Sequence, residues 1–165
     1  MTLSSIKNRI DFILKWAVII IMAAMTINVL WQVMSRFILS EPSSFTEELA
    51  RYMLVWLGIL GASYVAGQKM HLAVDLLATK LSLKYKSILE ILIQFFVFVF
   101  ALFVMVIGGI RLVSITLTLN QISAALQIKL GFVYIVLPIS GLIMMFYSCY
   151  YIIEELNKLK IHRSL

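Results

Sequence analysis

The chain has 165 residues, of which 62% are hydrophobic and 13% are charged, and its formal net charge is +6. Soluble domains are about 45–50% apolar and about 25% charged, so this composition excludes an ordinary soluble protein and indicates the lipid bilayer as the solvent. The positive charge does not indicate a nucleic-acid partner, because the basic residues form no stripe on a soluble face.

Four long apolar segments follow one another along the chain. They predict membrane-spanning helices over approximately residues 16–37, 45–68, 88–112 and 130–154. A spanning helix needs about 20 mostly apolar residues to cross about 30 Å of hydrocarbon. Its backbone groups must also be satisfied internally, because the bilayer core offers no water. We therefore predict an all-α integral membrane protein, with residues 1–165 forming a single membrane domain.

The distribution of basic residues predicts the orientation of these spans. Ten of the 14 Lys and Arg residues precede the first span, lie between the second and third, or follow the fourth. Positive residues accumulate on the cytoplasmic side of membrane proteins, so both termini are expected in the cytoplasm. The same residues would attract anionic membrane lipid.

A polar stripe runs along the end of the first span, at helical spacing: Asn28, Gln32, Ser35 and Arg36. Polar groups at membrane depth usually face other helices and hydrogen-bond to them. We interpret Asn28 and Gln32 as helix-packing residues. A contact with a partner protein and a substrate path are the alternatives that the spacing leaves open.

The second span begins with the charged residues Glu47, Glu48 and Arg51. The i,i+3 and i,i+4 spacings allow ion pairs to Arg51. A hairpin between the first two spans would bring Arg36 close to the same carboxylates. These four residues are predicted to form a local charge network or a docking surface for another protein. Ion coupling is a third interpretation, disfavoured because the cluster lies at the membrane edge and not at its centre.

Further along the second span, small residues recur every four positions. This pattern lets two helices approach closely. We predict helix-packing roles on this span for Trp56, Gly58, Ala62 and Ala66.

Residues 70–85 show an amphipathic pattern between the second and third spans. They predict a helix lying in the cytoplasmic membrane interface, with His71 and Asp75 on its polar face. In the fourth span, Pro138 is expected to kink the helix.

Enzymatic chemistry finds little support in the sequence. The two histidines, His71 and His162, fall in interfacial segments and not in the bundle, which disfavours a bis-histidine haem. His71 and Asp75 supply two metal ligands, whereas a zinc site needs three or four. We expect no enzyme activity, no cofactor and no metal in this chain.

Three segments in order resemble the small membrane subunit of the tripartite ATP-independent periplasmic (TRAP) transporters, the DctQ-like small permease. They are Trp31–Phe37 (WQVMSRF), Phe45–Ala62 (FTEELARYMLVWLGILGA) and His71–Asp75 (HLAVD). The resemblance covers the first half of the chain in sequence, and the second half in span count and topology.

The resemblance implies a scaffold role in the bacterial inner membrane. A periplasmic solute-binding protein would deliver an organic acid, such as a C4-dicarboxylate or a sialic acid. A large elevator-type membrane subunit would bind the solute and sodium, and the small subunit would brace it. The charge cluster of Arg36, Glu47, Glu48 and Arg51 would then set the surface offered to these partners.

A second class of function stays open on the sequence alone. The chain could be a membrane anchor or assembly subunit of an unrelated complex, such as a respiratory one. Bound haem or quinone would favour that class, whereas sodium-dependent and binding-protein-dependent uptake would favour the transporter.

Overall fold

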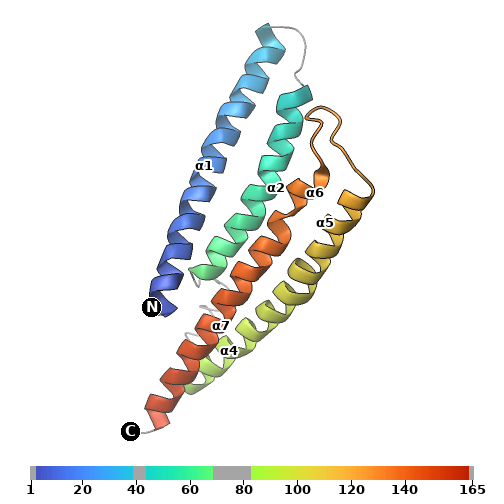
Figure 1. Ribbon diagram of the computed structural model, residues 1–165. Helices are drawn as coiled ribbons and strands as arrows, with labels where there is room; N and C mark the ends of the chain where they lie inside the picture. The colour runs from blue at the N-terminus through green and yellow to red at the C-terminus, as the bar shows by residue number, and fades with distance from the viewer. Residues whose placement is uncertain (1–2, 39–43, 69–82, 164–165) are drawn as a thin grey trace.

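The computed structural model describes residues 3–38, 44–68 and 83–163, and they form four helical rods (Figure 1). The first two are α1 (Leu3–Ile38) and α2 (Ser44–Gly67). The third joins α4 (Leu83–Phe100), the π-helix η1 (Ala101–Gly108) and α5 (Gly109–Thr118). The fourth consists of α6 (Leu130–Tyr134) and α7 (Val136–Arg163). Four stretches are long and apolar enough to cross a membrane, which confirms the predicted all-α fold with four spans.

The helices extend beyond the predicted apolar segments. The α1 helix starts at Leu3 and not near residue 16, the third rod continues to Thr118, and α7 runs to Arg163. Charge-free windows mark the part of a helix inside hydrocarbon, whereas the helix itself continues into the interface. The predicted interfacial helix over 70–85, with His71 and Asp75, lies almost wholly outside the described residues and stays a prediction.

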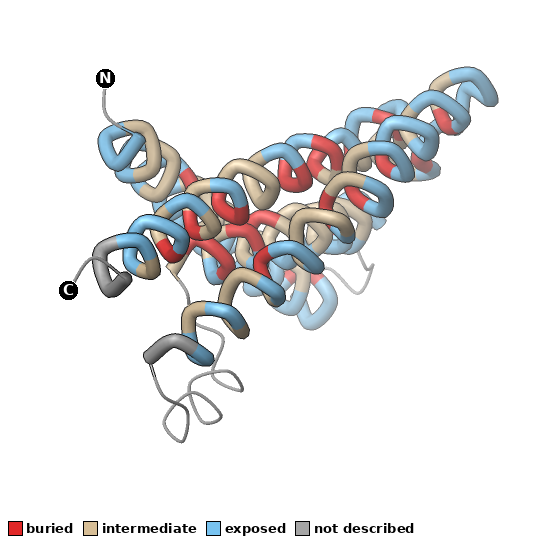
Figure 2. The backbone as a smooth tube through the Cα atoms, turned by 90° about the horizontal axis from the view of Figure 1, so that it is seen from below, coloured by how far each residue is buried: buried red, intermediate tan, exposed pale blue. Residues whose placement is uncertain are grey.

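The four rods are arranged as a row and not as a closed square. The α1 helix packs mainly on α2, α2 packs on α7, and α7 packs on α4 and η1. Figure 1 shows the start of α1 and the end of α7 at the same end of the bundle, here called the termini end. The opposite end, called the loop end, holds the ends of α1 and α5 and the starts of α2 and α6. Figure 2 shows the buried residues on the inner sides of the helices and exposed residues around them.

Two serines hold the centre of the bundle together. Ser63 on α2 and Ser140 on α7 are fully buried, and their hydroxyl groups are hydrogen-bonded to each other. The Ser140 hydroxyl also reaches the carbonyl oxygen of Ile59 at 3.0 Å. Hydrogen bonds between membrane helices are worth about 0.6–2 kcal/mol each, so this pair fixes the register of α2 against α7.

Glycine allows α7 to approach η1 closely. A Cβ atom at Gly141 would lie 2.8 Å from the Cβ of Met105 and 2.8 Å from Cγ2 of Val106. At Gly109, a Cβ atom would lie 2.9 Å from Cδ of Pro138.

The fourth rod is interrupted at Ile135, just before Pro138. Proline has no N–H for the carbonyl four residues earlier, which weakens the helix at this point.

This packing predicts that Gly141→Ala destabilises the chain. The added methyl group has no room, and overpacking typically costs about 1–3 kcal/mol. The matched control is Gly58→Ala, where a Cβ atom meets nothing within 4 Å. Thermal unfolding in one mild detergent should give a lower midpoint for Gly141→Ala, by about 2–4 °C per kcal/mol, and no loss for Gly58→Ala. Equal midpoints for the two variants would contradict the close approach.

Candidate functional site at the loop end

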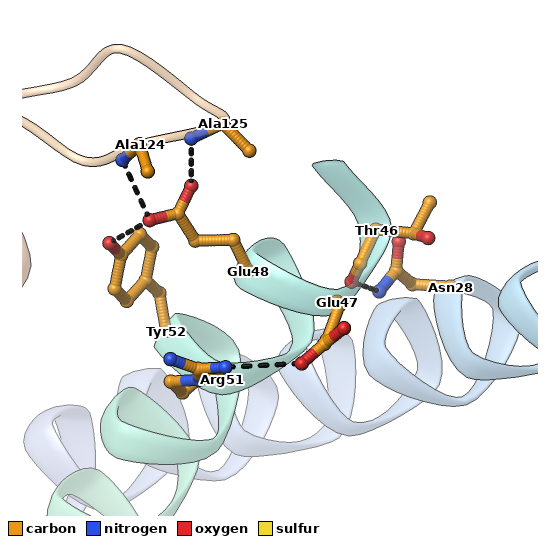
Figure 3. Close-up of polar contacts among 8 residues, drawn as sticks. All are labelled: Asn28, Thr46, Glu47, Glu48, Arg51, Tyr52, Ala124 and Ala125. Carbon is orange, nitrogen blue, oxygen red and sulfur yellow. Dashed lines mark hydrogen bonds and ion pairs between the residues drawn. The ribbon is translucent and has the colours of Figure 1, made fainter. Parts of the chain in front are cut away.

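The Glu48 carboxylate joins α2 to the loop between α5 and α6 (Figure 3). One oxygen accepts hydrogen bonds from the backbone N–H groups of Ala125 at 2.7 Å and Leu126 at 2.9 Å. The other accepts from the Ala124 N–H at 3.2 Å and from the Tyr52 hydroxyl at 2.7 Å. Three successive N–H groups pointing at one anion form a backbone nest. Here the anion is a side chain of the same protein.

Local hydrogen bonds shape the loop around this nest. The Ser123 N–H donates to the Ile128 carbonyl at 2.9 Å, which brings the two arms of the loop together. Between them, Gln127 adopts a positive φ of 56°. Its side-chain amide donates to the Ala124 carbonyl at 2.9 Å. These bonds turn the three N–H groups toward α2, so the loop and the first helical hairpin form one unit.

Glu47 and Arg51 form the other half of the cluster. Their side chains pair at 3.2 Å and are 61% and 67% exposed, respectively. Glu48 does not pair with Arg51, although the i,i+3 spacing allows it, because the loop donates hydrogen bonds to both of its oxygens. The predicted approach of Arg36 to these carboxylates is not seen: in the described part of the chain, Arg36 is exposed and has no ion-pair partner.

The predicted packing residues divide into two groups. The Asn28 amide donates to the Thr46 carbonyl at 2.7 Å, and the Trp56 indole N–H donates to the Val133 carbonyl at 2.9 Å. Ala66 is buried, and Gln32 is half-buried with its carbonyl accepting from the Ser35 hydroxyl. Gly58 and Ala62 instead lie on an exposed face of α2, so their packing role stays a prediction about a partner.

A second polar cluster, at the termini end, was not predicted from the sequence. Lys7 and Asp11 on α1 pair at 2.7 Å, and the Tyr147 hydroxyl donates to Asp11 at 2.5 Å. The Tyr151 hydroxyl donates to the Gly67 carbonyl, and the Lys7 ammonium lies 5.9 Å from the Tyr151 ring centroid. The sequence does carry a signal for this cluster. Lys7 and Asp11 have the i,i+4 spacing of an ion pair, and two tyrosines lie four residues apart in an apolar helix.

Neither cluster has the composition of a metal centre in the part of the chain that the structure describes. Within the described ranges, no three His, Cys, Asp or Glu side chains come together as metal ligands. Both clusters join helices: Glu48 holds the second hairpin on the first, and Asp11 holds α1 on α7.

Comparison with known proteins places this four-span membrane protein among transporter subunits. Residues 25–158 match the family of tripartite ATP-independent periplasmic transporters, DctQ component. The match covers most of the chain, so the chain belongs to this family. It is a family of transporter subunits and not of enzymes, which agrees with the prediction from the sequence and decides against an anchor of an unrelated complex.

Three relatives show how the matching region occurs in other proteins. A TRAP transporter small permease protein of Haemophilus influenzae is 27% identical over 139 residues, 84% of each chain. The sialic acid TRAP transporter permease protein SiaT of the same species is 29% identical over 119 residues, 70% of this chain and 18% of the relative. The isethionate TRAP transporter permease protein DctMQ of Oleidesulfovibrio alaskensis is 28% identical over 96 residues, 58% of this chain and 15% of the relative.

The loop-end geometry predicts that Glu48→Gln releases the loop. A glutamine amide has one acceptor oxygen, and its NH2 group would face backbone donors. The backbone amides of residues 124–126 should then exchange with solvent deuterium about tenfold faster or more. Hydrogen–deuterium exchange of the peptide spanning 119–130 measures this. Glu47→Gln is the matched control and should leave the exchange unchanged; the same rate in both variants would contradict the role of Glu48.

The termini-end cluster predicts that Tyr147→Phe destabilises the chain. The variant keeps the ring but removes one donor from the half-buried Asp11 carboxylate. A hydrogen bond to a charged group is worth about 1.5–3 kcal/mol. Tyr150→Phe is the control, because among the described residues the Tyr150 hydroxyl has no hydrogen-bond partner. Thermal unfolding should show a loss for Tyr147→Phe only, and equal midpoints would exclude the proposed bond.

Proposed function

We propose that this chain is the small scaffold subunit of a TRAP transporter, bracing a large elevator-type membrane subunit. Family membership supports a place in such a transporter. The two long relatives add to it, since in each a region similar to this chain occupies under a fifth of a single permease polypeptide. A segment that is covalently joined to a permease in some proteins is well suited, as a separate chain in others, to bind a permease subunit permanently.

The observation that carries the scaffold role is the Glu48 joint. It ties the loop between α5 and α6 to the start of α2, so the loop end of all four rods is one connected surface. The serine pair and the Asp11 cluster fix the same helices at the centre and at the termini end. A chain with joints at three levels suits a fixed frame against which another subunit moves.

The transported solute in this proposal is an organic acid, either a sialic acid or a C4-dicarboxylate. The relatives named for sialic acid and isethionate both carry anionic organic compounds, which supports the class. The resemblance of the sequence motifs adds the C4-dicarboxylates. Solute and sodium would bind to the large subunit, and this chain would bind neither of them.

The loop end would face the periplasm of a bacterial inner membrane, with both termini in the cytoplasm. The basic residues near the start of α1 and the end of α7 support this orientation. The exposed Glu47–Arg51 pair would then lie where a solute-binding protein arrives. It borders a hollow of about 200 Å³ that also includes Ser44 and Ala125.

An uptake experiment tests the proposal. The tagged chain should retain a hydrophobic partner more than twice its size in mild detergent, as determined by intact-mass measurement. Reconstituted with this partner, it should support solute uptake that requires both a sodium gradient and the binding protein. Recovery of the chain alone, or with a redox subunit, would overturn the proposal.

The charge pair offers a sharper variant of this test. Replacing Glu47 and Arg51 together by Gln should slow binding-protein-dependent uptake by about three- to tenfold while assembly is unchanged, because rim charges act mainly on association. Lys15→Gln, in the exposed first part of α1, is the charge-removal control and should have no effect. Normal uptake by the double variant would exclude the pair from docking.

A further inference from the structure

An apolar groove opens at the loop end between α1 and α6, with α2 as its floor. The row arrangement creates it: α1 packs mainly on α2, and its hydrogen bond to α7, between Asp11 and Tyr147, lies toward the termini end. The groove has a volume of about 280 Å³, and its walls are almost entirely apolar. The residues that shape it are Ile21, Leu49, Tyr52, Met53, Trp56 and Phe132.

The polar atoms that border the groove are already used within the chain. The Tyr52 hydroxyl donates to Glu48, and the Trp56 indole N–H donates to the Val133 carbonyl. An occupant therefore gains nothing from hydrogen bonding inside the groove. The groove therefore favours an apolar occupant, which the surrounding bilayer supplies.

The length of the groove distinguishes an acyl chain from a partner helix. Along α2 it runs from Leu49 to Trp56, about 10 Å at 1.5 Å per residue. At its inner end the Trp56 indole bridges α2 to α6. A spanning helix needs about 30 Å of hydrocarbon thickness, whereas the chain of one lipid occupies a single leaflet of about half that depth. The groove is shorter than one leaflet, so it can hold part of an acyl chain but not a spanning helix.

A second hollow adjoins the first. It has a volume of about 510 Å³, lies between α1 and α2, and shares Leu49 and Met53 with the groove. Trp31, near the end of α1, borders it. Two neighbouring hollows on either side of two shared side chains match a ligand with two acyl chains.

A basic residue adjoins the groove in the sequence. Lys129 follows the groove residue Ile128 and immediately precedes the fourth candidate span, Leu130–Lys160. Its side chain is exposed, and in the described part of the chain it has no ion-pair or hydrogen-bond partner. This position, at the boundary of the span, is the depth at which lipid phosphates lie.

We infer that the groove between α1, α2 and α6 is a binding site for one diacyl phospholipid of the loop-end leaflet. Its acyl chains occupy the two hollows on either side of Leu49 and Met53, and its phosphate pairs with Lys129. The lipid fills the space that α1 leaves beside α6, and so completes the packing of the loop end.

Native mass spectrometry of the full chain, purified in mild detergent with the partner it retains, tests this site. The probe is phosphatidylglycerol added at known concentrations. The unmodified protein should keep one phospholipid per chain. Met53→Trp fills the groove and should lower retention about tenfold or more. Leu54→Trp is the matched control: it adds the same ring at the adjacent position, which is 58% exposed on another face of α2, and should retain the lipid.

A surface variant keeps the test independent of folding in the core. Lys129→Gln should weaken phosphatidylglycerol binding about fivefold, since one basic residue near a membrane surface contributes a factor of this size. Equal retention in all four proteins, or no lipid on the unmodified protein, would overturn the site. So would a photo-crosslinker at Phe132 that captures a polypeptide instead of lipid, because the groove would then be a protein interface.

Discussion

The contact on which the loop end depends is the carboxylate of Glu48 with three successive N–H groups of a loop 76 to 78 residues further along the chain. Those donors belong to a turn and so have no helical partners. Three successive donors directed at one point favour an anion at that point. One charged side chain from α2 satisfies all three, and in doing so it joins two helical hairpins that the chain makes separately.

The remaining joints follow from the weakness of the hydrophobic effect between helices in lipid. Apolar side chains pack on lipid as well as on one another, so membrane helices associate through close contact and hydrogen bonds. Close contact is achieved at Gly67, where a Cβ atom would meet the Tyr147 ring, and at Gly141 against η1. Hydrogen bonds join Ser63 to Ser140 and Trp56 to the Val133 carbonyl. Of these contacts, only Trp56–Val133 lies toward the loop end, and it joins α2 to α6. None of them joins α1 to α6, so these two helices stay apart at the loop end.

The span count and helical class could be predicted because hydropathy alone decides them in a bilayer. The inward direction of Asn28 and Trp56 was also predictable, since polar atoms in an apolar helix must find partners. The partner of Glu48 was not predictable, because helical spacing points only to neighbours such as Arg51, and nothing periodic marks residues 124–126. The π-helix at Ala101–Gly108 was also not predicted. It packs closely against Gly141 of α7, and this contact depends on tertiary packing.

The loop-end carboxylates divide by energetic role, and this division bears on docking. Glu48 is engaged with the backbone, so recruiting it to a partner would release the loop. The Glu47–Arg51 pair is exposed and of the i,i+4 type, which contributes only about 0.3–0.5 kcal/mol. Exchanging this bond for one to an incoming protein costs almost nothing in stability. In the proposed scaffold role, Glu48 would stay fixed within the fold while the Glu47–Arg51 pair would be free to change partners.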